Sequence, residues 1–360
     1  MKKLFNSKDT MPDDMIDGYV FAYPDIVQRG HNPRVVRRTR LTTKPDGSES
    51  PRSDQKRSER ELSKNNKVAL LIGNGCGHEP IAMGFVGEGL LDANVVGDVF
   101  SAPSADLILE GIEEVCGSAG AVLLISRHEG DVINGNAAAL MAQDDGLDVR
   151  PLLMYDDISS APRGQESDRR GAAGTMFIYK ILGAAAETGM GLTELVQLGE
   201  AVRSETRTLG AAVSPGVSPL TGELMFTLPD NEIYIGMGVH GEPGVSRREI
   251  GPVRDLVHFM VTALLDDKPI EANTPVVVLI NGSGGTTMME LLTVYREVHN
   301  LLASHNIPDV SPMIGSFSTT QEMGGFSISL FTPTESMLSF WRAPQASPHF
   351  PNIFSPPDTL

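Results

Sequence analysis

Short hydrophobic segments alternate with longer segments of helical periodicity from residue 67 onward. Three of the short segments are rich in aliphatic side chains and bounded by glycine or charged residues, which predicts buried strands at residues 68–72, 121–125 and 151–155. Predicted helices lie at residues 79–90, 105–116 and 132–142. Alternation of strand and helix at this spacing is typical of a mostly parallel sheet with helices on both faces.

A longer helical region follows at residues 174–188 and 192–206, with Gly189 and Gly191 marking the break between two helices. The second half repeats the alternation less regularly. Its predicted strands lie at residues 232–239, 276–280 and 326–331, and its predicted helices at residues 253–265, 288–302 and 333–340. No period of about 20–50 residues recurs, which excludes a repeat protein.

These elements predict the α/β class, with two α/β domains whose mostly parallel or mixed sheets are flanked by helices. We expect an N-terminal domain at residues 1–190, a C-terminal domain at residues 191–345 and a Pro-rich tail at residues 346–360. A chain of 360 residues is long enough for each domain to bury its own core.

The composition excludes several classes of protein. A formal net charge of −17 argues against a dedicated nucleic-acid-binding protein. No apolar run approaches the roughly 20 residues needed to cross a bilayer, and polar residues follow the first five, so we expect neither a membrane span nor a signal peptide. The two cysteines, Cys76 and Cys116, cannot form a disulfide framework, and we expect a cytoplasmic protein.

Residues 44–64 are almost free of apolar side chains and rich in Ser, Pro, Gly and mixed charge. We interpret them as a mobile surface insertion in the N-terminal domain. Because the first 67 residues carry 15 basic and 10 acidic side chains, a basic arm that binds an acidic partner is the alternative interpretation.

The most informative segment joins the first predicted strand to the first predicted helix and reads Gly-Asn-Gly-Cys-Gly-His-Glu-Pro over residues 73–80. Small residues let a backbone approach a ligand, so we expect Gly75, Cys76 and Gly77 to form a cradle for an anion or a carbonyl at a helix N-terminus. The segment lacks both the third glycine of a dinucleotide-binding motif and the Gly-Lys-Ser/Thr of a P-loop. His78 is either a ligand-binding group at the carboxyl end of a strand or a capping histidine.

Two further segments place polar residues after predicted strands. Residues 126–131 read Ser-Arg-His-Glu-Gly-Asp, and Asp131 is either a catalytic carboxylate or a helix N-cap. Residues 236–244 read Gly-Met-Gly-Val-His-Gly-Glu-Pro-Gly, which exposes the imidazole of His240. That imidazole can act as a nucleophile or general base toward a carbonyl, or it can simply lie in a tight turn.

Three histidines, His78, His128 and His240, are each followed closely by a glutamate. Zinc sites usually show tighter local spacing, so no metal site is predicted. A further glycine-rich segment at residues 281–287 joins a predicted strand to a helix, and it could hold a ligand, line a subunit contact or form a plain turn.

Taken together, these motifs resemble the substrate-binding subunit of the dihydroxyacetone kinases, over roughly residues 10–345. The resemblance rests on the Gly-His-Glu-Pro loop, Gly130-Asp131, the His-Gly-Glu-Pro-Gly segment, and segments at residues 183–187, 315–328 and 339–344. It implies a fold of two α/β domains and a homodimer.

The resemblance also implies roles for individual residues. His240 would form a covalent hemiaminal with the carbonyl of a short ketose, while His78 and Asp131 would serve as acid–base or orienting groups on the substrate hydroxyl. Only about twenty residues follow Trp341, so phosphoryl transfer would require a separate helical nucleotide-binding partner. We expect this chain to bind no cofactor itself, and the phosphoryl donor would be ATP or a phosphoprotein.

One departure from the family affects the substrate. In the family the segment that ends in this aspartate reads Lys-Asn-Tyr-Thr-Gly-Asp. This chain has Ser126 at the lysine position, followed by Arg127 and His128. Arginine grips carboxylate or phosphate in a bidentate manner, unlike lysine. We therefore predict Ser126, Arg127 and His128 as substrate contacts, for dihydroxyacetone, a four-carbon or branched ketose, or a ketose phosphate.

Three functions follow from these residues. A kinase subunit that holds a ketose on His240 is the preferred interpretation. An isomerase needs only a base, an acid and a polarised carbonyl, which His78 and Asp131 could supply while Arg127 pairs with a substrate phosphate. A ketose-sensing regulator needs only capture of the ketose, and the presence of both His78 and Asp131 argues against a pure sensor.

Overall fold

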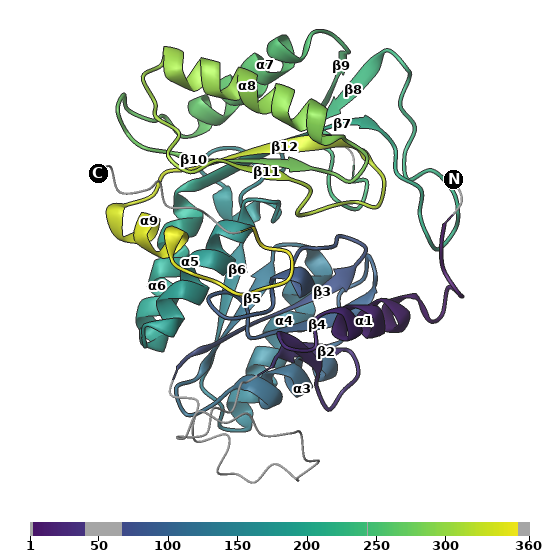
Figure 1. The fold of residues 1–360 in the computed structure, drawn as a ribbon, viewed down its shortest axis with the longest axis vertical. Coiled ribbons are helices and arrows are strands. Elements are labelled where there is room, and N and C mark those ends of the chain that lie inside the picture. Colours follow the sequence, from purple (N-terminus) through teal and green to yellow (C-terminus); the bar gives the residue numbers. More distant parts are fainter. Residues whose placement is uncertain (1–2, 40–66, 243, 352–360) are drawn as a thin grey trace.

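The computed structural model describes residues 3–39, 67–242 and 244–351, and it contains two six-stranded sheets with helices around them (Figure 1). The first sheet has the strand order β1-β2-β4-β3-β5-β6, and β3 pairs in parallel with both β4 and β5, as β5 does with β6. Its strands are β1 (Val27–Arg29), β2 (Val35–Arg38), β3 (Ala69–Cys76), β4 (Ala93–Val99), β5 (Ala121–Ser126) and β6 (Val149–Met154).

The central strands of the first sheet are apolar on both faces, and helices cover both faces. Along β3, Ala69 and Leu71 join the core under α3 and α4, whereas Leu70 and Ile72 join the core under α5 and α6. The helices of this half are α1 (Met11–Ala22), α3 (Ala105–Val115), α4 (Glu129–Asp144), α5 (Thr175–Glu187) and α6 (Leu192–Ser204). Short 3₁₀ turns lie at Met83–Phe85 and Glu166–Asp168.

The second sheet has the order β11-β10-β12-β7-β8-β9 and is mostly antiparallel, with one parallel pair between β10 and β11. Its strands are β7 (Thr206–Ser214), β8 (Glu232–Ile235), β9 (Ser246–Glu249), β10 (Val277–Gly282), β11 (Met313–Gly315) and β12 (Gly324–Phe331). Helices α7 (Val253–Asp267) and α8 (Met288–Ser304) pack on its outer face, and α9 (Glu335–Arg342) follows β12 (Figure 1).

The two halves share one core through α5. Every residue from Thr175 to Ala186 is buried, as expected of a helix that is covered on all sides. Phe177 stacks on Phe331 of β12 and contacts Trp341 of α9, with ring centroids 5.0 and 5.1 Å apart. The two sheets are therefore held together by packed apolar contacts from both halves of the chain.

The α/β class with mixed sheets is confirmed, and most predicted elements lie within a few residues of their predicted bounds. The helix predicted at residues 79–90 is wrong, because only a single 3₁₀ turn forms there. A Cβ on Gly87 would lie 1.9 Å from the carbonyl oxygen of Ala346, so this segment is shaped by a close approach of the C-terminal chain. Three glycines in the segment also weaken a helix.

The sequence pattern missed several elements, chiefly α1, β4 and β7. Helix α6, which the boundary at residue 190 assigns to the second domain, packs against α5 and β6 of the first half. The insertion at residues 44–64 and the last residues of the tail lie outside the described residues. Among the described residues, no helix is both long and apolar enough to cross a bilayer.

Candidate active site

A cavity of about 50 Å³ lies where the carboxyl ends of β3 and β5 meet the loop after β8. Side chains from both halves of the chain line it: His78, Ser126, His128, Asp131, Thr175, Tyr179, His240 and Ser318. Gly75 contributes backbone, and a Cβ there would lie 2.6 Å from the amide nitrogen of Ser101. The position is that expected for ligand sites in α/β sheets, outside the carboxyl ends of parallel strands.

Three imidazoles meet at this cavity. The ring centroid of His240 lies 4.8 Å from that of His78 and 5.0 Å from that of His128. Phe100 covers the group, with its ring centroid 4.9 Å from His78 and 5.8 Å from His240. Residues that the sequence places in three separate loops therefore form a single site.

One segment of the second half, residues 318–320, ties the loops together. Thr319 donates its amide to the carbonyl of His78 and its hydroxyl to the carbonyl of Glu79, and the Thr320 hydroxyl donates to the carbonyl of Val239. Asn281, in β10 at the start of the glycine-rich segment of residues 281–287, accepts the amides of Phe317 and Ser318. Asn281 therefore helps to position the segment that joins the loops of His78 and His240.

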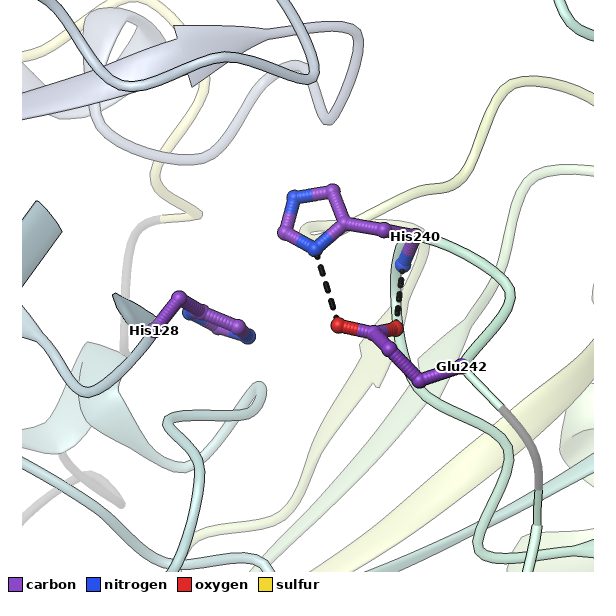
Figure 2. Close-up of side chains that lie close together, drawn as sticks. All are labelled: His128, His240 and Glu242. Carbon is purple, nitrogen blue, oxygen red and sulfur yellow. Dashed lines mark hydrogen bonds and ion pairs between the residues drawn. The ribbon is translucent and has the colours of Figure 1, made fainter. Parts of the chain in front are cut away.

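His240 is paired with Glu242 (Figure 2). The Nδ1 atom of His240 lies 3.1 Å from Oε1 of Glu242, and the His240 amide donates to Oε2 at 2.9 Å. Although burial opposes ionisation, the hydrogen bonds and charge of His240 hold the pKa of Glu242 well below its usual range. An ionised Glu242 can only accept, so Nδ1 of His240 is the donor in this pair, and in the neutral imidazole Nε2 is the nitrogen with the lone pair.

His78 is held as a neutral acceptor. Its Nδ1–H donates to the carbonyl of Thr319 at 2.7 Å, which leaves Nε2 unprotonated. Nε2 is buried and has no hydrogen-bond partner among the described residues. Burial, and then the neighbouring His240, lower the pKa of His78 to about 3. His78 is therefore suited to accept a hydrogen bond from a ligand hydroxyl and unsuited to serve as a base at neutral pH.

Asp131 has the opposite character. It lies in the first turn of α4, but the N-cap is His128, so the carboxylate is free for chemistry instead of capping. Oδ1 of Asp131 is buried without a hydrogen-bond partner in the part of the chain that the structure describes, and burial raises the pKa of Asp131 to about 7. A carboxyl with that pKa can both donate and accept a proton near neutral pH. The arrangement therefore supplies a nucleophile, an acceptor and an acid–base group around one small cavity.

His128 stands beside Asp131. Its Nδ1 lies 3.1 Å from Oγ of Ser126 and 3.9 Å from Oδ2 of Asp131. Burial, and then the neighbouring His240, lower the pKa of His128 to about 4, so the ring is neutral. Of the three substrate contacts predicted at residues 126–128, Ser126 and His128 line the cavity.

Three predicted residues lie away from the cavity. Arg127 pairs with Asp168 at 3.1 Å on the surface. Cys76 lines a different hollow beside the N-terminal segment, and burial raises the pKa of its thiol to about 12. The amide of Gly77 donates to the carboxylate of Glu79 at 3.0 Å, so it is already satisfied within the loop. The loop thus supplies Gly75 and His78 to the cavity, without a helix N-terminus.

A family model described as the Dak1 domain matches residues 38–349. The chain belongs to the Dak1 family. The relative named as the dihydroxyacetone-binding subunit of PTS-dependent dihydroxyacetone kinase 1, from Listeria innocua, is 37% identical over 92% of this chain and 94% of its own length. The resemblance seen in the sequence is thereby confirmed.

Two solved structures share the fold of this Dak1 chain. The dihydroxyacetone kinase from C. freundii, crystallised with AMP-PNP and Mg²⁺, has a TM-score of 0.85 and 30% identity, and the match covers 100% of this chain and 62% of that one. A dihydroxyacetone kinase operon co-activator has a TM-score of 0.83 and 28% identity, with 94% of this chain and 97% of that one covered. One architecture therefore occurs in an enzyme and in a regulator.

Several residues of the Dak1 site were not predicted from the sequence. Thr175 and Tyr179, on the buried helix α5, line the cavity. Asp156, two residues after β6, accepts the amides of Ala172 and Gly174 and so fixes the start of that helix. Arg170 donates to Asp157 at 2.8 Å and to the carbonyl of Gly236 at 3.0 Å. Periodicity could not reveal these residues, because their roles depend on which loops meet.

Proposed function

We propose that this chain is the ketose-binding catalytic subunit of a dihydroxyacetone-type kinase. It captures a short ketose, such as dihydroxyacetone or a four-carbon ketose, as a hemiaminal on Nε2 of His240. The observation that carries the proposal is the pairing of His240 with an ionised Glu242, which leaves that lone pair free beside a small cavity.

Capture requires one proton transfer. The lone pair of Nε2 attacks the ketone carbon, the π electrons of the carbonyl move to oxygen, and protonated Asp131 donates a proton to that oxygen. The imidazole of His240 becomes a cation, which the carboxylate of Glu242 stabilises through the Nδ1 proton. Asp131 is left ionised by this step.

The ionised carboxylate of Asp131 then serves the second step. It accepts the proton of the terminal hydroxyl while that oxygen attacks the phosphoryl donor, which restores the protonated carboxyl. His78 accepts a hydrogen bond at Nε2 and orients a substrate hydroxyl. A pKa of about 7 suits Asp131 to both transfers, and the low pKa of His78 suits that residue to orientation alone.

The phosphoryl donor belongs to a partner in this proposal. A separate nucleotide-binding subunit would bring ATP, or a phosphoprotein would donate directly, and this chain would act as a homodimer that binds no cofactor itself. The relative from Listeria innocua, similar over nearly its whole length, is named as a dihydroxyacetone-binding subunit, which supports this division of labour.

Mass spectrometry of the intact chain tests ketose capture. Incubation with dihydroxyacetone should add the full mass of the ketose, because addition to the carbonyl eliminates no water. His240→Ala should abolish the adduct. His258→Ala, at an exposed position on α7, is the matched control and should retain it. An unchanged adduct in His240→Ala would overturn the covalent proposal.

A ketose-responsive regulator is the second candidate, favoured by the likeness to the operon co-activator. Both candidates predict the adduct, so phosphoryl transfer separates them. The donor-binding subunit of a dihydroxyacetone kinase, supplied with ATP or a phosphoprotein, should yield a ketose phosphate with the native chain. Asp131→Asn should lower that rate by about 10²–10⁴-fold. An adduct without any phosphate transfer favours the regulator.

The isomerase interpretation has no comparable support. It relied on Arg127 to pair with a substrate phosphate, and that guanidinium is paired with Asp168 outside the cavity. We therefore do not propose this activity.

A further inference from the structure

The side chains of His128, His240 and Glu242 offer one ligand atom each within 4.8 Å of one another, the one such group of histidine, cysteine and carboxylate side chains found among the described residues (Figure 2). We infer that these three residues form a binding site for a divalent transition-metal ion of the Zn²⁺ type. The sequence favoured no metal here because the ligands come from two loops far apart in the chain.

The donor set matches what zinc binds in proteins. Two imidazoles and one carboxylate, with a fourth position left for water or substrate, form one of the known open zinc sites. Ligand atoms at normal zinc distances in a tetrahedral arrangement lie about 3.4 Å apart. The separation of 3.1 Å between Nδ1 of His240 and Oε1 of Glu242 is within a few tenths of an ångström of that value. A metal ion can therefore replace the proton between them with a small opening of the pair.

His128 is prepared to be the third ligand. Its Nδ1 lies 3.1 Å from Oγ of Ser126, a contact that orients the ring, and in the tautomer in which Nδ1–H donates to Oγ the Nε2 atom is left for the metal. Metal-bound histidines usually have such a partner on the second nitrogen. In Figure 2 the ring of His128 is seen edge-on and points toward the carboxylate of Glu242.

The charges around the three side chains and their exposure to solvent permit a metal ion to bind. Glu242 supplies a negative charge, and the guanidinium of Arg170 is paired with Asp157 at 2.8 Å. The side chains of His240 and Glu242 are 29% and 34% exposed, whereas that of His128 is 15% exposed. An ion can therefore enter from solvent on the side of the second sheet and reach His128 last.

Metal binding has a consequence for ketose capture, and this consequence alone rests on the proposed function. A neutral imidazole carries one proton and one lone pair. If Nδ1 of His240 gives its lone pair to a metal, the proton moves to Nε2, and Nε2 loses the lone pair that would attack a ketone. Zinc and the ketose adduct are therefore mutually exclusive on this chain.

Equilibrium dialysis of the untagged full chain against ZnCl₂, followed by elemental analysis, tests the site. We expect one Zn²⁺ per chain, and His128→Gln and Glu242→Gln should each lose it. His258→Gln, on the surface of α7, should retain it. Ser126→Ala should weaken binding by about 10-fold, because the residue only orients His128. Circular dichroism melts of each variant show that it is folded.

The outcomes separate the two proposals. Absence of bound zinc in the native chain, or equal binding by the native chain and folded His128→Gln, would overturn the metal site. Loss of the ketose adduct when the native chain is saturated with zinc supports mutual exclusion, and an adduct that persists refutes it. A chain that binds zinc but never captures a ketose would leave the metal site standing and remove the covalent proposal.

Discussion

The rings of His78 and His240 lie with their centroids 4.8 Å apart, although one follows a strand of the first sheet and the other follows a strand of the second. The two rings differ in the hydrogen-bond partner of Nδ1. His78 donates its Nδ1–H to a backbone carbonyl, and His240 donates its Nδ1–H to the carboxylate of Glu242. The partner of each ring thus decides its role, because a carboxylate stabilises an imidazolium far better than a carbonyl does.

The negative charge of Glu242 should contribute more to the rate of adduct formation on His240 than its hydrogen bond does. Glu242→Gln preserves the shape and one hydrogen bond to His240 but removes the anion that stabilises the imidazolium of the adduct. We expect the rate of adduct formation to fall by about 100-fold, corresponding to about 2.7 kcal/mol. Time-resolved mass spectrometry with dihydroxyacetone measures it, and a change of less than threefold would contradict the assignment.

Asp131 should reduce the stability of the folded chain at neutral and alkaline pH. Burial raises its pKa from 3.8 to about 7, so between these values the folded chain binds more protons than the unfolded chain. The free energy of unfolding therefore falls as pH rises through this window. Asp131→Asn should be more stable than the native chain at pH 8, by on the order of a few kcal/mol.

Urea unfolding at pH 8 and pH 4 checks this expectation. Near pH 4 the carboxyl of Asp131 is protonated in the folded chain, so the difference between native and variant should largely disappear. A difference that stays the same at both pH values would show that charge burial at residue 131 is not its cause.

Arg127 should contribute little to substrate affinity. It forms an exposed ion pair with Asp168, and pairs of this kind contribute about 0–1 kcal/mol. Arg127→Ala should change KM for dihydroxyacetone, and for a ketose phosphate, by less than about twofold. A selective rise in KM for the phosphorylated ketose would restore the isomerase interpretation.

Gly183 should tolerate no side chain. It lies on α5 where a Cβ would be 2.4 Å from Cα of Leu90 and 2.5 Å from the carbonyl oxygen of Gly89. Gly183→Ala should destabilise the chain by about 1–3 kcal/mol, because backbone atoms cannot move aside easily. Gly18→Ala is the control, since Gly18 is exposed on α1 with open space around it, and it should stabilise by about 0.5–1 kcal/mol.

Several features of the chain followed from the sequence alone. The strands at β3, β5 and β10 were recognisable because each is a short apolar run buried on both faces. The segments that follow β3, β5 and β8 carry His78, Asp131 and His240, and the family motifs in these segments pointed to a ketose. Periodicity and composition are local properties, and these features are local as well.

Other features were decided only by the tertiary structure. The segment predicted as a helix at residues 79–90 is held against the C-terminal chain, where glycines permit close contact. Arg127 forms an ion pair with Asp168, whereas Ser126 and His128 line the cavity. The raised pKa of Asp131 and the grouping of His128, His240 and Glu242 depend on burial and on which loops meet. Spacing along a chain does not specify distances between loops, because packing of the two sheets around α5 sets them.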